Sequence, residues 1–294
     1  MSEATRSWKI GRTRVTSIVE AQTDGIPPEF FFPAATAETM QRHAWLAPHF
    51  ADDRGMIGLR VQAFVVEAAG RLVVVDPCVG NGKERESPFW NDQQWPFMER
   101  FRTAGFDPAE VDLVVYTHLH VDHVGWATHR VDGRWVPTFT GARHLFVERE
   151  LEFLRSRREA EPDARAIDDD SIAPIFGAGL ADLVEVDADL GLGLRLEPTA
   201  GHTPGHASLW VESEGESGLV TGDFIHHPVQ CSEPTLAFVS DEDPAQAQAT
   251  RQAVLRRLGD QGVLTFGTHF PTEPVGRVVP EAETDTWIFQ PDVV

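Results

Sequence analysis

The chain has 294 residues, of which 41% are hydrophobic, so we predict a single domain over residues 1–294 with a sizeable core. Its formal net charge of −21 at pH 7 disfavours a nucleic-acid partner, because an acidic surface repels a phosphate backbone. The polar N-terminus lacks a signal-peptide core, and no apolar stretch approaches the ~20 residues of a membrane helix, so we expect a cytoplasmic protein with no membrane partner.

Short apolar runs predict strands in the first half of the chain, bounded by turn residues such as Ala69-Gly70. The expected strands are residues 14–19, 59–66, 71–76 and 111–116. Residues 84–96 are expected to form a loop, and residues 97–104 a helix that ends near Gly105. The two cysteines, Cys78 and Cys231, are too few for a disulfide framework, and we expect both to be reduced and buried.

The second half also alternates predicted strands and helices. Helical segments are expected at residues 148–158 and 171–176, and strands at residues 143–147, 183–186, 194–198, 207–211, 219–221 and 263–266. Residues 244–258 give the clearest helix, with Asp241 and Asp243 as candidate N-caps and Gly259 at its end. Because strands dominate and helices lie between them, we predict two packed sheets with helices outside.

Four potential metal ligands fall within six residues, directly after the strand predicted at residues 111–116: His118, His120, Asp122 and His123. A strand that ends in such a cluster delivers ligands into a loop at the edge of a sheet. A purely structural role is disfavoured, because four polar groups packed behind a buried strand would each need a partner.

Three later segments each place a metal-capable residue beside glycine after an apolar strand: His202, Asp223 and His269. Each alone is typical of an ordinary turn, but together with the first cluster they indicate a metal site. Imidazole and carboxylate suit zinc and similar divalent ions. Seven ligands exceed one tetrahedral ion and suit two ions, roughly 3.5–4 Å apart, that share a carboxylate. We therefore predict two divalent ions, most simply zinc.

This pattern resembles the metallo-β-lactamase superfamily, whose hallmark is His-x-His-x-Asp-His followed by a distant His, an Asp and a final His. The resemblance covers residues 60–270 and implies an α/β fold, an αβ/βα four-layer sandwich of two mixed sheets flanked by helices, with the site at the edge between the sheets. It implies a first metal on His118, His120 and His202, a second on Asp122, His123 and His269, and Asp223 bridging both. Asp76 resembles the residue that orients a ligand imidazole; a turn residue before Pro77 is the alternative.

The ligand spacing is most similar to the N-acyl-homoserine lactonases and the methyl parathion hydrolase group. That resemblance implies a metallohydrolase in which a metal-bridging hydroxide attacks a lactone or related small ester, with Asp122 and His226 as catalytic residues. His226 stands where the lactonases often carry a tyrosine that contacts the substrate carbonyl. An imidazole there can stabilise an oxyanion, or it is merely a polar residue at the site rim. His206 is expected to support its loop, and Tyr116 to lie in the core.

Other reactions of the same fold stay open: hydrolysis of an organophosphate, an aryl ester or a thioester, and a mononuclear iron redox activity. Two aromatic-rich segments, residues 26–50 and 89–98, are expected to form loops over the sheet edges. They can wall a pocket for an apolar group of a small-molecule substrate. A homodimer interface and ordinary core packing are the competing interpretations.

Overall fold

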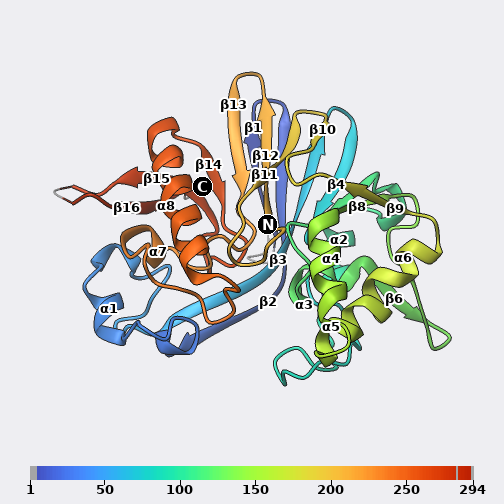
Figure 1. The fold of residues 1–294 in the computed structure, drawn as a ribbon. Coiled ribbons are helices and arrows are strands. Elements are labelled where there is room, and N and C mark those ends of the chain that lie inside the picture. The colour runs from blue at the N-terminus through green and yellow to red at the C-terminus, as the bar shows by residue number, and fades with distance from the viewer. Residues whose placement is uncertain (1–4, 283, 293–294) are drawn as a thin grey trace.

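The structure is a computed structural model that describes residues 5–282 and 284–292. Among these residues, two mixed sheets pack against each other, and helices cover their outer faces. Figure 1 shows α8 (Pro244–Gln261) on one flank of the strands and α2 (Phe97–Thr103), α4 (Glu148–Arg157) and α5 (Pro162–Ile167) on the other. The predicted α/β sandwich of two mixed sheets flanked by helices is confirmed.

The first sheet has the strand order β1-β2-β3-β4-β5-β8-β9. Its first four strands are antiparallel, whereas β4, β5, β8 and β9 run parallel, so the carboxyl ends of the parallel strands meet at one edge. The strands are β1 (Thr5–Ile10), β2 (Thr13–Ile26), β3 (Ile57–Ala68), β4 (Arg71–Val75), β5 (Leu113–Val115), β8 (Arg143–Val147) and β9 (Ala181–Val184).

The second sheet has the order β10-β11-β12-β13-β14-β15-β16. Within it, β13 and β14 are parallel neighbours, and α8 connects them. The strands are β10 (Asp189–Gly191), β11 (Leu194–Pro198), β12 (Ala207–Ser213), β13 (Glu216–Val220), β14 (Leu264–Phe266), β15 (Val275–Pro280) and β16 (Trp287–Pro291). A separate hairpin pairs β6 (Thr128–Val131) with β7 (Arg134–Pro137).

The remaining helices are short. The α-helices are α1 (Ala37–Gln41), α3 (Val121–Val124), α6 (Ala173–Gly177) and α7 (Val229–Ser232). Single 3-10 turns are η1 (Pro28–Phe30), η2 (Ala44–Leu46), η3 (Pro108–Glu110) and η4 (Gly125–Ala127), and η5 (Asp168–Ile172) is a π-helical segment.

Alternation along the strands builds the layers of the core, because successive side chains of a strand point to opposite faces. In β5 and the residue after it, Val114 and Tyr116 join the cluster beneath the helices, whereas Val115 joins the cluster between the two sheets. A third cluster packs the second sheet against α8 and the N-terminal segment. Each sheet is therefore buried on both faces, which explains the continuous apolar run at residues 111–116.

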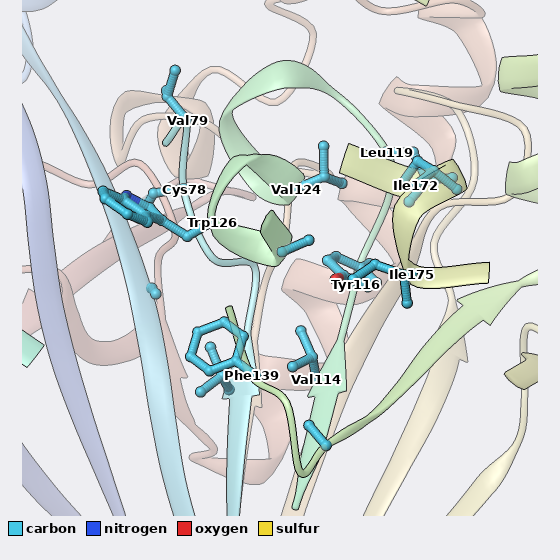
Figure 2. Packing of buried hydrophobic residues seen from close by; sticks show 14 of the residues in the cluster. Cys78, Val79, Val114, Tyr116, Leu119, Val124, Trp126, Phe139, Ile172 and Ile175 are labelled. Carbon is cyan, nitrogen blue, oxygen red and sulfur yellow. The ribbon is translucent and has the colours of Figure 1, made fainter. Parts of the chain in front are cut away.

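Apolar side chains also anchor the segment that carries the first four predicted ligands. Leu119 and Val124 are buried in the same cluster as Val114, Tyr116 and Ile175. Figure 2 shows these side chains around the loop and short helix that follow β5. The apolar residues alternate in sequence with the histidines and the aspartate. When the apolar side chains pack into the core, the polar side chains between them therefore point away from it.

Several element boundaries differ from the prediction. The helix α8 runs to Gln261, and the left-handed cap residue is Gly262, with φ of +63°. Gly259 lies inside this helix instead, where a Cβ would come within 2.8 Å of the Trp287 ring. The N-cap is Asp243, which accepts a hydrogen bond from the Gln246 backbone N–H. The strand expected at residues 183–186 is β9, which starts and ends two residues earlier.

Buried side chains settle two interpretations. Tyr116 lies in the core, and both cysteines are free and buried, as predicted. Core packing accounts for much of the two aromatic segments: Phe32, Met40 and Phe50 belong to the cluster against the second sheet, and Phe97 to the cluster beneath the helices. Within residues 5–282 and 284–292, no helix is long and apolar enough to span a membrane.

Candidate metal centre

The seven predicted ligands come from loops at one edge of the two sheets. His118 and His120 follow β5, and Asp122 and His123 lie on α3. His202 lies between β11 and β12, Asp223 follows β13, and His269 follows β14. The parallel pairs β4–β5 and β13–β14 deliver their carboxyl ends to this edge.

Glycine fixes the turn that carries Asp223. Gly222 has φ of +55°, and a Cβ there would lie 2.5 Å from His206 Nε2 and 2.8 Å from Thr117 Cβ. Only glycine adopts this conformation without strain and leaves room for both neighbours. The turn aims the Asp223 side chain back over the strand ends.

One group of imidazoles converges around His120. The Nδ1 atom of His120 lies 3.0 Å from His118 Nε2 and 2.9 Å from His202 Nε2. His118 and His202 are buried, and His120 is partly exposed. This is the set predicted to hold the first metal.

A second group gathers beside it. His123 Nε2 lies 3.3 Å from His269 Nε2 and 3.6 Å from Asp122 Oδ1, and His269 Nε2 lies 3.6 Å from Asp122 Oδ2. His123 and His269 are buried, whereas Asp122 is partly exposed and gives the group a solvent-facing side. This is the set predicted to hold the second metal.

Asp223 lies between the two groups. Its Oδ2 is 3.4 Å from His202 Nε2, 3.4 Å from His123 Nε2 and 3.7 Å from His118 Nε2, and its Oδ1 is 3.2 Å from His269 Nε2. The carboxylate therefore contacts members of both sets. The structure brings all seven predicted residues together around the Asp223 carboxylate.

The hydrogen bonds of the outer ring nitrogens define how these imidazoles face the cluster. His269 Nδ1 lies 2.8 Å from the Arg60 carbonyl oxygen, His202 Nδ1 lies 3.1 Å from Asp241 Oδ1, and His123 Nδ1 lies 3.0 Å from Asp76 Oδ2. Since a carbonyl or carboxylate only accepts, the Nδ1 atoms of His269 and His202 carry a proton, whereas His123 Nδ1 meets Asp76 at ion-pair distance without a hydrogen bond. The Nε2 atom of each ring then points into the cluster.

The outer ring nitrogen of His118 is also hydrogen-bonded, but to the hydroxyl of Thr117 instead of to a carbonyl or carboxylate oxygen. Its Nδ1 lies 3.1 Å from Thr117 Oγ1, and that hydroxyl donates its proton to Asp76 Oδ2 at 2.7 Å. His118 Nδ1 must therefore donate, which leaves its Nε2 lone pair facing His120 and Asp223. Asp76 serves both His118, through Thr117, and His123, which agrees with its predicted role of orienting a ligand imidazole.

This donor set fits a divalent cation. Burial lowers the pKa of His118 and His202 well below the usual range and that of His120 to about 3, so these rings are neutral. Burial also lowers the pKa of His123 and His269, but nearby carboxylates, Asp223 foremost, outweigh it and raise both. Converging ring nitrogens beside carboxylates attract positive charge, and imidazole with carboxylate is the ligand chemistry of zinc.

His226 lies inside the site, not at its rim. It is 1% exposed, and its Nε2 is 3.1 Å from Asp223 Oδ2. Its ring stacks on Phe238 with centroids 3.5 Å apart. Burial lowers the pKa of His226, and the Asp223 carboxylate opposes this shift. The interpretation of His226 as a rim residue is wrong, because Asp223, Phe238 and the buried His202 ring pack around it.

His206 supports the site without joining it. Its Nε2 accepts a hydrogen bond from the Asp223 backbone N–H at 2.7 Å, and its Nδ1 lies 2.8 Å from Thr199 Oγ1. Both ring nitrogens are thus occupied by the loops that carry Asp223 and His202. These contacts agree with the predicted supporting role of His206.

Sequence reasoning missed two buried carboxylates beside the ligand loops. Glu150 accepts hydrogen bonds from the backbone N–H groups of Leu119 and Gly205, and so joins the two loops that carry His118–His123 and His202. Asp241, expected as an N-cap candidate, contacts His202 instead. Glu150 looks like one more acidic residue of a charged helix, so only its burial, at 2% exposed, marks it.

A row of aromatic rings leads from His226 to the surface. Phe238 stacks with Phe31 at 5.7 Å, Phe31 meets Phe30 at 5.1 Å, and Phe30 meets Phe89 at 5.8 Å. Phe30 and Phe89 are 52% and 56% exposed. The two predicted aromatic segments therefore meet here, and their rings continue to the buried site.

Comparison with known proteins places this site in a family. The chain is 25% identical over 184 residues to an N-acyl homoserine lactonase of a Bacillus species, a match that spans 61% of this chain and just under two thirds, 64%, of that protein. It is 23% identical over 242 residues to the N-acyl homoserine lactonase of Bacillus cereus, covering 77% and 88%. A ribonuclease of Thermus thermophilus is 33% identical over 174 residues, 55% of this chain but 34% of that protein.

Solved structures of similar fold span nearly the whole chain. The hydrolase AbOPH has a TM-score of 0.80 at 23% identity and covers 98% of this chain and 97% of its own. AidC, a dizinc quorum-quenching lactonase, has a TM-score of 0.81 at 17% identity and covers 99% and 98%. Superfamily and relatives indicate a metallohydrolase, as predicted. The model of the metallo-beta-lactamase superfamily matches residues 56–269, well over half of the sequence, and the chain belongs to that superfamily.

Proposed function

We propose that the protein is a dinuclear metallohydrolase that opens a lactone or a related small ester. The observation that carries the proposal is the convergence of four Nε2 atoms, from His118, His123, His202 and His269, around one buried carboxylate, Asp223. One ion would be held by His118, His120 and His202, and the other by Asp122, His123 and His269, with Asp223 shared. Two zinc ions so held supply Lewis acidity that lowers the pKa of a water molecule and polarises a carbonyl oxygen.

Two side chains are proposed to act on the substrate side of the site. Asp122 is the most exposed carboxylate of the cluster, so it is placed to hold a water molecule by accepting its proton in a hydrogen bond. His226 is placed to donate a hydrogen bond to the carbonyl oxygen as negative charge develops on it. Its stacking on Phe238 fixes the plane of the ring and the direction of that donor.

The aromatic row supports a substrate with an apolar group. A chain or ring that leaves the reacting carbonyl near His226 can lie along Phe31, Phe30 and Phe89. Ligand sites are commonly walled by such side chains. The N-acyl homoserine lactonases among the relatives are named for a substrate of this kind, which favours a lactone with an acyl substituent.

The test is a hydrolysis screen of the purified protein with defined metals. The substrates are acyl-homoserine lactones of rising chain length, aryl esters, phosphotriesters and thioesters. We expect the highest kcat/KM for lactones, increasing with acyl length, together with about two zinc ions per chain. A preference for phosphotriesters or thioesters would contradict the proposed lactone substrate but leave a hydrolase. A single tightly held iron would overturn the hydrolytic proposal.

Asp223→Ala should lose metal and activity together, because it removes the one carboxylate that contacts both ligand sets. We expect metal content to fall from two ions to one or fewer and kcat/KM to fall by at least ~100-fold, because loss of a ligand should cost no less than the ~100-fold that loss of a partner of a ligand can cost. Metal analysis and the lactone assay check this. Asp260→Ala, an exposed carboxylate on α8, is the matched control and should change neither. A variant of Asp223 that kept both ions would refute the bridging assignment.

A further inference from the structure

Asp241 holds three parts of the molecule at once, although its side chain is fully buried. Its Oδ1 accepts a hydrogen bond from His202 Nδ1 at 3.1 Å, and its Oδ2 accepts one from the Phe238 backbone N–H at 3.0 Å. The Arg251 Nη2 atom lies 3.5 Å from Oδ2. A ligand imidazole, the aromatic row and α8 therefore meet at one carboxylate.

Backbone hydrogen bonds dock the segment around Asp241 onto the loop of His202. The Glu242 N–H donates to the His202 carbonyl oxygen at 3.1 Å, and the Asp243 N–H donates to the Gly201 carbonyl oxygen at 2.9 Å. The position of Asp241 is thus set against His202 by two bonds that do not involve its own side chain. The backbone therefore holds the His202 ring and the Asp241 carboxylate next to each other without the help of a bound metal.

Arg251 fixes the carboxylate from the other side. This buried guanidinium also donates to the carbonyl oxygens of Phe224, Pro234 and Leu236 at 2.9–3.1 Å. Those carbonyls belong to the chain that leads from Asp223 to Phe238. Arg251 is therefore anchored independently and offers Asp241 a compensating charge, which a buried carboxylate requires.

We propose that Asp241 is a positioning residue: it holds the His202 Nε2 lone pair on the first metal and, through Phe238, ties the aromatic row to the same ring. The inference rests on the proposed metal centre. Asp241 bonds the ring nitrogen that faces away from His120 and Asp223, so it acts through His202 and does not bind the same ion. The histidines proposed for the second metal have other partners: His123 Nδ1 faces Asp76, and His269 Nδ1 faces the Arg60 carbonyl oxygen. Asp241 therefore contacts only a histidine of the first set.

The test is competition between a zinc chelator and the holoprotein, in which two ions leave in separate steps. Asp241→Asn keeps the size of the side chain but removes its charge and one acceptor. We expect the affinity in one release step to weaken by 10–100-fold, the usual cost of disturbing a partner of a ligand histidine, and that in the other to weaken less. Equal weakening of both steps, or of neither, would overturn the proposal.

Asp243→Asn is the matched control, because it makes the same chemical change two residues away, at the N-cap of α8. It should lower Tm slightly and leave both release steps unchanged. If Asp241→Asn does not fold, Arg251→Lys tests the same contact from the other side, and it should weaken the same single step. If the wild type binds three ions and Asp241→Asn binds one fewer, then Asp241 is itself a metal ligand. That result would overturn the positioning role.

The same titration separates the two proposals. A wild-type protein that binds no pair of ions contradicts the proposed function itself. A wild-type protein that binds two ions, with an Asp241→Asn variant that holds both as tightly, contradicts only the role of Asp241. Phe238→Leu adds a second readout: it should raise KM for long-chain lactones and leave both release steps in place.

Discussion

At the scale of single residues, the buried carboxylate of Glu20 shows how the site's framework uses charge. Glu20 sits at a register shift of β2 and is 1% exposed. It accepts hydrogen bonds from the backbone N–H groups of Val79 and Gly80 and from Trp126 Nε1. The bulge turns a strand side chain toward the loop that follows Asp76, and so fixes that loop from beneath the ligand segment.

Burial raises the pKa of Glu20 from 4.5 to about 7, although its three N–H donors oppose the shift. The folded state then binds a proton more tightly than the unfolded state, so the contribution of Glu20 to stability is full below pH ~4.5 and is lost as pH rises through about 7. The quantity to follow is the free energy of unfolding of the wild type minus that of Glu20→Gln. We expect this difference to fall by on the order of 3 kcal/mol as pH rises from ~4.5 to above about 7.

Urea unfolding of both proteins at pH 5, 6 and 7.5 measures this difference, and the titration of the metal-site histidines cancels because both proteins share it. Glu212→Gln, an exposed glutamate on β12, is the control and should show no such pH dependence. A difference between the wild type and Glu20→Gln that stays constant with pH would mean that Glu20 is ionised throughout.

The residues that could be predicted at this scale are those whose spacing is their signal. His118, His120, Asp122 and His123 stand out because four ligands in six residues are hard to explain otherwise. Asp241, Glu150 and Phe238 carry no local pattern, because each acts through a neighbour brought in from a distant part of the chain. The position of His226 three residues after Asp223 marks it in the sequence, but its burial depends on Phe238, whose ring packs over it.

At the scale of elements, continuous apolar runs predicted the central strands well. The strands β3, β4, β5 and β8 are buried on both faces, so their composition alone identifies them. The strands β1, β15 and β16 lie toward the sheet edges and mix exposed with buried positions. Their pairing with a neighbour defines them, and no window of sequence contains that neighbour.

A buried ionic cluster fixes the loop at residues 79–96 to the π-helical segment η5. Asp170 accepts hydrogen bonds from Arg85 Nη1 at 2.7 Å and Arg85 Nη2 at 3.0 Å, and Lys83 Nζ lies 3.3 Å from Asp170 Oδ1. Lys83 is fully buried, and burial lowers its pKa from 10.5 to about 7. This loop carries Phe89, so the cluster also holds the outer end of the aromatic row.

Asp170→Ala should destabilise the fold by about 3–5 kcal/mol, because it leaves the Arg85 charge buried without its partner. Equilibrium unfolding in urea measures the loss. The neighbouring Asp169→Ala is the control: its carboxylate is 54% exposed and pairs with Arg158, so its loss should cost no more than about 1 kcal/mol. Similar losses for the two variants would show that the buried cluster does not stabilise the loop.

At the scale of the whole molecule, the acidic surface bears on which substrates reach the site. The net charge of −21 includes the cluster's own carboxylates, and two divalent ions would offset only a small part of it. A field of this sign attracts cations and repels anions over a Debye length. It favours metal loading and a neutral ester or lactone, and it disfavours nucleic acid and anionic esters.

We therefore expect the protein to discriminate against a negatively charged substrate in a manner that salt removes. For an aryl ester bearing a carboxylate and its uncharged methyl-ester counterpart, the ratio of neutral to anionic kcat/KM should fall by up to about tenfold as ionic strength rises from ~0.01 to ~1 M. Screening shortens the Debye length from ~30 to ~3 Å over this range. It therefore removes the repulsion of the anionic ester and leaves the neutral ester unaffected. The neutral ester reports any effect of salt on the enzyme itself. A ratio that does not change with salt would place the selectivity in contacts at the site, with His226 and the aromatic row, and not in the field of the molecule.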